Sequence, residues 1–497
     1  MSVFGFVALG YEGELVRVEV DVRPGIPGME IVGLPSGAVR EARERIRIAW
    51  KNTGFKFPQE RTLVNLSPAD LPKTGAGFDL PMALALLEAT GQVPTVPSYL
   101  ALGELALDGS LRRVAGILPA LAKASELGIK RALLPSACQE EAEALSGIEF
   151  ISAPNLSELV ENLKSQCWRT TRGMGVLERR RLDVDAQLGN WRTRPGLNEV
   201  LAVAAAGGHS VLLYGPPGGG KTVAARNLRV LTPPLEPDEA WEVARLKSLR
   251  GEENHYYPEV PFREPHHAAN LAGLVGGGRS WEPGEASLAH RGILFLDEAP
   301  QFAPSFLQTL REPLEDGWLR LARAGRQVSY PARFQLVMTA NACPCGQAGR
   351  TKGVCLCGAQ TIRRYWDRLG GALIDRVDIR IFLNAEAESA PLDLQEMKKT
   401  LVRLENALER RRSRKSQEKN AWRDWREVLD STPLLTSQKN LWKETLHRED
   451  WSSRGGVSLI RMARTLADLD DRDQIRDEDL LRAISFRKPA GEQYWQN

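Results

Sequence analysis

A glycine-rich segment between an apolar run and a predicted helix is the clearest candidate for chemistry in this sequence. Residues 215–222 read GPPGGGKT, which fits the phosphate-binding pattern GxxxxGK[ST]. Glycines at such a turn let backbone N–H groups wrap the phosphates of a nucleotide, and the N-terminus of the following helix adds positive potential. We therefore expect ATP to bind here, with Lys221 reaching the β- and γ-phosphates and Thr222 ligating Mg²⁺. The predicted nucleotide-binding residues are Gly215, Pro216, Pro217, Gly218, Gly219, Gly220, Lys221, Thr222 and Val223.

A second apolar segment, residues 293–298 (ILFLDE), ends in two carboxylates. In open α/β sheets ligands bind at the carboxyl ends of the strands. We expect Asp297 to hold the Mg²⁺ shell and Glu298 to act as the general base that polarises the attacking water. A carboxylate pair at a strand end can also cap a helix, but its combination with a phosphate-binding loop favours the metal and base roles. Asn341 ends the next apolar segment and would orient the same water, although asparagine also closes strands into turns.

Arginines further along the chain are candidates for stabilising charge on the γ-phosphate. Arg376, in the segment LIDRVD, is a candidate arginine finger that would reach the nucleotide of a neighbouring subunit. The alternative for Arg376 is a salt bridge with Asp375 or Asp378. Arg454 and Arg461 lie in the predicted C-terminal lid and either could contact phosphate; we favour Arg454.

Four of the six cysteines lie within the fifteen residues 343–357. They are Cys343, Cys345, Cys355 and Cys357. Four thiolates from two short turns could bind one Zn²⁺ tetrahedrally, although C-x-C is less common in zinc sites than C-x₂-C. The alternative is four reduced cysteines in a surface loop. Zinc would stiffen the loop after Asn341, but no proposed ATP-site role needs it, so hydrolysis should not strictly depend on it.

Length and composition restrict the class of protein. The chain has 497 residues, which predicts about two to four domains, and 42% hydrophobic with 26% charged residues is ordinary for a globular protein. No run of about 18 apolar residues occurs, so no membrane span is expected, and the first residues lack the features of a secretory signal. We therefore expect a cytoplasmic protein. Because the net charge is only +3, a nucleic-acid surface would be local.

Short apolar segments in the central part of the chain must position these candidate residues. Those at 209–214, 292–296 and 334–339 alternate with helical patterns. This alternation predicts a parallel sheet with crossover helices. Since the carboxyl ends of parallel strands share one edge, such a sheet would bring the polar residues that follow the strands together.

The N-terminal part is also typical of α/β structure. Residues 15–23 alternate between apolar and charged side chains, which indicates a half-buried strand. Helices are predicted after Ser36, after Asp79 as a capping residue, and over 117–127. The arginine-rich segment that follows is more commonly a solvated connector than a DNA contact. The predicted division is 1–167 for an N-terminal domain, 168–195 for a basic linker, 196–385 for the ATPase core and 386–497 for a helical lid.

Seven motifs resemble those of one family of AAA+ ATPases, the magnesium-chelatase-like ComM/YifB family. They are REPHH (263–267), GGGR (276–279), PGEASLAHRGILFLDE (283–298), YPARF (330–334), NACPCG (341–346), LIDRVDI (373–379) and RMARTLADL (461–469). The resemblance covers nearly the whole chain. It implies a homo-hexameric DNA helicase that uses ATP and Mg²⁺ and promotes branch migration during homologous recombination and natural transformation. Single-stranded and branched DNA would be its partners, with recombination proteins as further candidates.

The resemblance extends to minichromosome-maintenance helicases and chelatase motor subunits, and it implies an insertion and a β-hairpin. The insertion would fall around 268–290 and the hairpin at 317–330, with its tip near Ala324 and Gly325. The alternating pattern of 318–328 supports the hairpin. The predicted DNA contacts are Arg320, Arg323 and Arg326. A solvated hairpin is the alternative.

The N-terminal segment resembles the proteolytic domain of Lon. Residues 72–79 and 103–118 match the stretches that carry its catalytic serine and lysine, but Gly77 and Leu118 occupy those positions. Neither side chain can act in peptide hydrolysis. The resemblance therefore implies a domain kept to form the ring or to guide DNA.

A chelatase-type motor that remodels a partner protein is the second functional hypothesis. The basic hairpin favours DNA, and the sequence lacks the acidic, integrin-like partner-binding domain that chelation would need.

Overall fold

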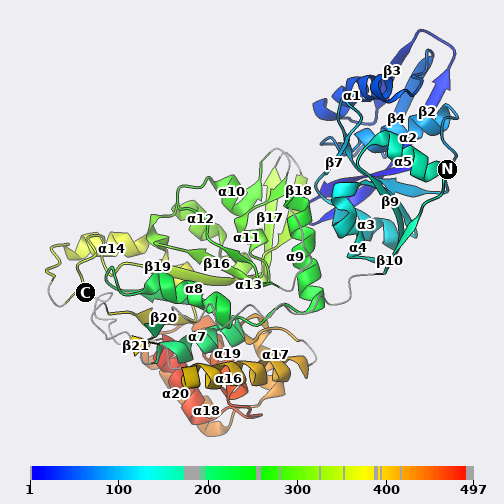
Figure 1. Ribbon diagram of the computed structural model, residues 1–497. Coiled ribbons are helices and arrows are strands. Elements are labelled where there is room, and N and C mark those ends of the chain that lie inside the picture. The colour runs from blue at the N-terminus through cyan, green and yellow to red at the C-terminus, as the bar shows by residue number, and fades with distance from the viewer. Residues whose placement is uncertain are drawn as a thin grey trace.

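The computed structural model describes residues 3–172, 192–193, 196–252, 259–278, 281–323, 326–350, 353–384, 390–391, 394–414 and 417–487. Figure 1 shows an N-terminal α/β domain in blue and cyan, a central α/β core in green and yellow, and C-terminal helices in orange and red. Most of the predicted basic linker lies outside the described residues. The predicted combination of α/β domains with a helical C-terminal domain is confirmed.

The N-terminal domain is built on an eight-stranded mixed sheet with the order β10-β9-β8-β5-β1-β2-β4-β3. Its strands are β1 (Val3–Leu9), β2 (Glu12–Arg23), β3 (Gly28–Val32), β4 (Arg61–Ser67), β5 (Tyr99–Ala101), β8 (Arg131–Pro135), β9 (Ser146–Ala153) and β10 (Arg169–Arg172), beside the small pair β6 (Glu104–Leu105) and β7 (Leu111–Arg112). The helices are α1 (Gly37–Thr53), α2 (Asp79–Ala89), α3 (Ile117–Glu126), α4 (Gln139–Glu143) and α5 (Leu156–Lys164). The alternating segment 15–23 forms the second part of β2, which confirms the predicted strand.

The prediction that Asp79 caps the second helix is wrong. Asp79 is the first residue of α2, and no side chain caps that helix end. The Asp79 carboxylate is fully buried and accepts two hydrogen bonds from the Arg45 guanidinium, over 2.8 and 2.9 Å, and one from the backbone N–H of Leu105 over 3.2 Å. A buried carboxylate takes the partner that compensates its charge, and this pairing with Arg45 replaces the capping bond.

The central core contains a five-stranded parallel sheet with the order β13-β16-β19-β12-β20. Its strands are β12 (Val211–Tyr214), β13 (Phe262–Arg263), β16 (Ile293–Leu296), β19 (Gln335–Ala340) and β20 (Ile379–Phe382). The predicted parallel sheet is thus confirmed. Because β12, β19 and β16 are consecutive neighbours, the residues that follow them meet at one edge of the sheet.

Helices and small strands surround this sheet (Figure 1). The helices are α7 (Leu197–Gly207), α8 (Lys221–Leu231), α9 (Pro237–Arg250), α12 (Pro304–Thr309), α13 (Pro313–Asp316), α14 (Ala359–Asp367) and α15 (Gly371–Ile374). The predicted insertion contains α10 (Leu271–Val275), β14 (Gly276–Gly277), β15 (Glu282–Pro283) and α11 (Glu285–Leu288). The short strands β11 (Arg192–Thr193) and β21 (Ala390–Pro391) pair with each other. The predicted hairpin is present as β17 (Trp318–Arg323) and β18 (Arg326–Pro331).

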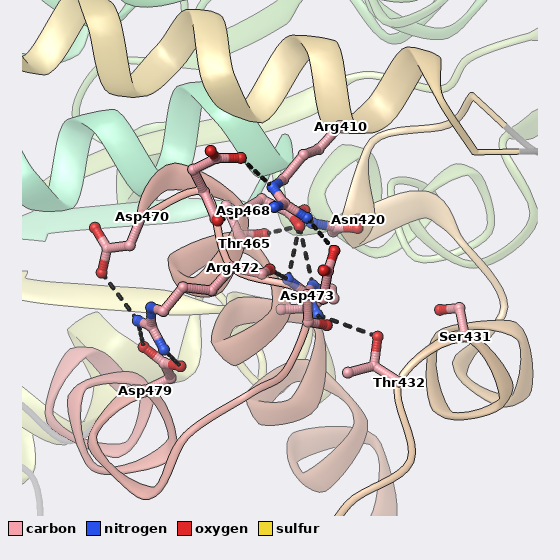
Figure 2. Close-up of polar contacts among 12 residues, drawn as sticks. Arg410, Asn420, Ser431, Thr432, Thr465, Asp468, Asp470, Arg472, Asp473 and Asp479 are labelled. Atoms are coloured by element: carbon pink, nitrogen blue, oxygen red, sulfur yellow. Dashed lines mark hydrogen bonds and ion pairs between the residues drawn. The ribbon is translucent and has the colours of Figure 1, made fainter.

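The C-terminal helices pack around α19 (Ser453–Leu469), most of whose residues are buried. They are α16 (Leu394–Arg412), α17 (Trp425–Ser431), α18 (Thr436–Arg448), α19 (Ser453–Leu469) and α20 (Asp477–Arg487). Figure 2 shows a polar network at the end of α19, in which Arg410 of α16 donates to Asp473 over 2.6 Å and Arg472 donates to Asp479 over 2.7 and 2.8 Å. Arg410 of α16 thereby stabilises the segment that follows α19.

The N-terminal domain docks on the core through the β1–β2 turn. The Tyr11 backbone N–H donates to the carbonyl of Ser329 in β18 over 3.0 Å, and the Arg245 guanidinium of α9 lies 4.2 Å from the centre of the Tyr11 ring. Gly10 permits this approach because its φ is +72° and a Cβ there would lie 2.9 Å from the Ser329 carbonyl oxygen. The N-terminal domain therefore rests directly on a strand of the hairpin.

Replacing Tyr11 by alanine is expected to loosen this docking. The ring is 7% exposed and packs among side chains of α9, α11 and β18, so its loss should cost about 3 kcal/mol at the interface. In calorimetry, the N-terminal domain should then unfold in a transition of its own at a lower temperature than the core. Leu9→Ala, which removes a more exposed side chain from the end of β1 beside the same turn, is the control. Identical thermograms for both variants would refute a docking role for Tyr11.

Candidate nucleotide-binding site

The phosphate-binding loop connects β12 to α8 and has positive φ angles at three of its glycines. Gly215, Gly218 and Gly220 have φ values of +145°, +84° and +77°, which side chains rarely allow. A Cβ on Gly215 would also lie 2.3 Å from the backbone oxygen of Leu383, just after β20. Glycine at position 215 is therefore required both by its backbone conformation and by the closeness of the neighbouring strand.

Lys221, the first residue of α8, lies against this loop. Its ammonium donates to the carbonyls of Gly215 and Pro216, each over 2.9 Å, and to Oδ1 of Asn341 over 3.1 Å. Burial lowers the pKa of Lys221, while the nearby carboxylates of Asp297 and Glu298 act in the opposite direction. The structure thus brings the predicted lysine, the predicted water-orienting asparagine and the carboxylates into one site.

The two predicted Mg²⁺ ligands lie side by side. Thr222 Oγ1 donates to the carboxylate of Asp297, at 3.2 and 3.3 Å from its two oxygens. Hydroxyl and carboxylate oxygens are ligands that suit Mg²⁺, which commonly binds one or two carboxylates together with substrate phosphates. This pair of residues fits a magnesium ion bound with a nucleotide.

Thr339 is a residue of this site that the sequence analysis missed. Its hydroxyl donates to Asp297 Oδ1 over 2.5 Å and accepts the backbone N–H of Glu298 over 2.8 Å. It is fully buried in β19. A hydroxyl near the carboxyl end of a mainly apolar, fully buried strand was the available signal, and Thr339 holds both carboxylate residues from the neighbouring strand.

Glu298 has a backbone conformation that is rare for a residue with a side chain. Its φ is +51° and its ψ is +51°, the left-handed region. The hydrogen bond from its N–H to Thr339 holds this turn, and the Glu298 carboxylate accepts a hydrogen bond from the Gln301 side chain. Strain of this kind is concentrated at functional sites, which supports a chemical role for Glu298.

Arg376 forms a salt bridge, but with neither of the two residues considered from the sequence. Its guanidinium binds the carboxylate of Glu315 in α13 and the carbonyl of Ala372. Asp375 accepts hydrogen bonds from Ser452 and Arg487 instead, and Asp378 accepts them from His209, Ser210 and Ser458. These contacts tie the segment that carries Arg376 to the C-terminal helices.

The two lid arginines have different environments. Arg454, at the start of α19, is about half exposed and binds Glu315, the same carboxylate that binds Arg376. Arg461 donates to the Arg423 carbonyl, and burial lowers its pKa. Arg454 and Arg376 therefore converge at one point on the surface, whereas Arg461 is engaged within the C-terminal helices.

The chain matches three family models, each over a different part of its length. Residues 192–390 match magnesium chelatase subunit ChlI, residues 18–138 match a second model of that subunit, and residues 395–487 match its C-terminal region. YifB of Escherichia coli strain K12 is 37% identical over 97% of this chain and 95% of its own length. The competence protein ComM of Haemophilus influenzae is 35% identical over 98% of this chain and 97% of its own length.

The chain belongs to the ComM/YifB family of magnesium-chelatase-like ATPases. Membership in this family implies ATP hydrolysis with Mg²⁺, which agrees with the arrangement of Lys221, Thr222 and Asp297 described above. Among the described residues, no helix has both the length and the apolar character that a membrane crossing requires.

A weaker similarity connects this ComM/YifB-family chain to Lon. Lon protease 2 of Bacillus subtilis is 23% identical over 168 residues, which is 30% of each chain. Leu118, at the position where the resemblance places a lysine, is 1% exposed, and its N–H donates to Ser248 Oγ of α9 over 3.1 Å. Ser248 Oγ in turn donates to Glu141 over 2.7 Å. The region around Leu118 now serves as a contact between domains.

The hairpin of this family member is anchored on one face. Leu319 and Tyr330 are buried against the core, while Arg320 is exposed and binds Glu312 and Asp316, each over 2.5 Å. Arg323 and Arg326 pair at the last register position of the hairpin backbone. Their side chains and the tip 324–325 lie outside the described residues.

Proposed function

We propose that this protein is an ATP-driven, homo-hexameric ring helicase that moves on single-stranded and branched DNA. It would promote branch migration during homologous recombination and natural transformation, with recombination proteins as further partners. The observation that carries the proposal is the arginine-bearing hairpin β17–β18 on a nucleotide-binding core, since a basic hairpin suits a ring pore that grips a phosphate backbone. The relative ComM of Haemophilus influenzae is named a competence protein, which points to the same process.

In the proposed cycle of ATP binding and hydrolysis, the residues of the nucleotide site have separate roles. Lys221 and the glycine-rich loop bind the β- and γ-phosphates. Thr222 and Asp297 would hold Mg²⁺, which would neutralise charge that develops on the phosphates. Glu298 takes the proton of the attacking water, and Asn341, which already contacts Lys221, orients that water.

Arg376 and Arg454 would act on the nucleotide of the adjacent subunit. Both bind Glu315, a residue of α13, and α13 is followed directly by the hairpin strand β17. Asp316 of the same helix binds Arg320 of the hairpin. When the γ-phosphate of a neighbour attracts the two arginines away from Glu315, the contacts that hold α13 change, and the hairpin beside it shifts.

The discriminating experiment measures ATP hydrolysis and DNA binding in parallel. Forked or single-stranded DNA should stimulate ATP hydrolysis by the purified full-length protein, and the protein should move a branched junction when ATP is supplied. Replacing both Arg323 and Arg326 by alanine should weaken DNA binding while sparing basal hydrolysis. It should also lower the dependence of log Kd on log salt by about 1.4, since each phosphate contact to a single strand contributes about 0.7.

The matched control removes two positive charges elsewhere. Lys439 and Lys443 are exposed on α18, so replacing both by alanine should leave DNA affinity and its salt dependence unchanged. Unchanged DNA affinity of the Arg323 and Arg326 variant at moderate salt would rule out the pore role of the hairpin.

A chelatase-type motor that remodels a partner protein is the second candidate function. It is favoured by the three family models, each of which describes a part of subunit ChlI. ATP hydrolysis that responds to no nucleic acid would select this function over the helicase.

A further inference from the structure

The four cysteines after Asn341 form a cluster that the proposed ATPase cycle does not use. Their sulfur atoms all lie within 4.8 Å of one another. Cys343 Sγ lies 3.3 Å from Cys345 Sγ and 3.5 Å from Cys355 Sγ, and the sulfurs of Cys345 and Cys355 are 3.7 Å apart. A zinc ion with four thiolates at about 2.3 Å has its sulfurs about 3.8 Å apart, so the cluster is close to the size of such a site.

The first pair of cysteines lies on a tight turn that presents sulfur to the cluster. The Gly346 N–H donates to the Cys343 carbonyl over 3.0 Å, with Gly346 at a φ of +72°. The Ala348 N–H donates to Cys343 Sγ over 3.3 Å. Backbone N–H groups that point at sulfur stabilise the thiolate form, which is the form that binds a metal.

The second pair of cysteines lies on a segment whose apolar side chains face outward. Val354 is 77% exposed and Leu356 is 89% exposed, while Cys355 and Cys357, which alternate with them, turn to the cluster. Burying a valine or leucine would contribute about 1.5–3 kcal/mol each, so this orientation needs a compensating interaction. Binding of zinc to four thiolates, worth about 10–16 kcal/mol in zinc-finger peptides at pH 7, is large enough to supply it.

Residues 346–350, which follow the first cysteine pair, pack against the phosphate-binding loop. The Arg350 guanidinium contacts the Pro217 carbonyl over 3.4 Å, and a Cβ on Gly346 would lie 2.8 Å from the Pro217 ring. At the other end of the cluster, the chain enters α14, where the hydroxyl of Tyr365 accepts the N–H of Asn341 over 3.1 Å. The segments on the two sides of the cysteine cluster, residues 346–350 and α14, thus both contact the nucleotide site.

We propose that Cys343, Cys345, Cys355 and Cys357 bind one Zn²⁺ as a closed structural site that braces the phosphate-binding loop and Asn341. Four protein ligands complete the tetrahedral shell, so no position is open for a reactive water. Binding releases the protons of the thiols and leaves a zinc–thiolate centre of net charge −2. The proposal that zinc binds here does not depend on the proposed DNA activity. The proposal that zinc stabilises the phosphate-binding loop rests on ATP binding at that loop.

Metal analysis tests the site directly. Protein purified without chelators from zinc-supplemented medium should contain one zinc per chain, and the Cys345→Ser/Cys355→Ser variant should contain none. Cobalt titrated into the metal-free parent protein should give the intense thiolate-to-metal absorption of a tetrahedral thiolate site. Cys167→Ser, which removes an exposed cysteine far along the chain from the cluster, should retain zinc. Zinc content near zero in the parent protein, with no cobalt–thiolate absorption, would overturn the proposal even if the double variant fails to fold.

Nucleotide binding tests the bracing role. Removing zinc from the folded parent protein should raise the Kd for a fluorescent ATP analogue about tenfold, which corresponds to about 1.4 kcal/mol, and adding zinc back should restore it. If protein that has demonstrably lost its zinc binds the ATP analogue with an unchanged Kd, zinc does not stabilise the phosphate-binding loop. That result would not contradict the zinc site itself. A protein that binds zinc and ATP but ignores DNA would contradict only the proposed helicase.

Discussion

The Glu298→Gln variant is expected to bind ATP with near-parental affinity and to hydrolyse it about 10²- to 10⁴-fold more slowly, the range that a general base contributes. Glutamine keeps the size of the side chain but cannot accept the proton of the attacking water. Thr339 would still hold the backbone N–H of residue 298, because that hydrogen bond does not involve the side chain. The variant should therefore keep the geometry of the strand end and lose the chemical step.

Single-turnover hydrolysis and equilibrium nucleotide binding, measured on the same preparation, separate these two effects. Glu259→Gln is the matched control: it makes the same chemical change in a partly exposed pair with Arg229, which should contribute less than about 1 kcal/mol. If Glu298→Gln hydrolyses ATP at the parental rate, another group must activate the water.

The arrangement of the candidate nucleotide site could be predicted from the sequence because the residue patterns that indicate it are local. A glycine-rich loop, or a carboxylate pair after an apolar run, can be recognised from a few consecutive residues. The parallel order β16-β19-β12 then brings Asp297, Asn341 and Lys221 together, and only the alternation of strands and helices was needed to expect that.

The contacts that hold this site were not predictable, because they join residues far apart in the sequence. Thr339 donates a hydrogen bond to Asp297, which follows the neighbouring strand. Glu315 forms salt bridges with both Arg376 and Arg454, which lie in separate segments. Asp79 shows the same limit, since its sequence pattern matches a helix cap and its partner Arg45 lies 34 residues away. Partner choice for a buried charge depends on the tertiary structure, which local patterns do not contain.

The Arg376→Ala variant is expected to bind ATP but to hydrolyse it about 10³- to 10⁵-fold more slowly, as for loss of an arginine finger. The Arg376 side chain is nearly buried beside Glu315, and its buried Nε has no hydrogen-bond partner within the described part of the chain. Arg376 would have to leave Glu315 to reach a phosphate of the adjacent subunit, and its Nε would then also gain an acceptor.

Mixing two inactive proteins tests whether Arg376 acts between subunits. In rings assembled from equal amounts of Arg376→Ala and Glu298→Gln subunits, about one quarter of the interfaces join an intact Glu298 to an intact Arg376 from the neighbour. Hydrolysis should therefore reappear in the mixture, although each variant alone is inactive. Arg368→Ala, an exposed arginine of the same region, should hydrolyse ATP normally by itself. If the mixture stays inactive although the two proteins co-assemble, Arg376 does not act on the nucleotide of the neighbouring subunit.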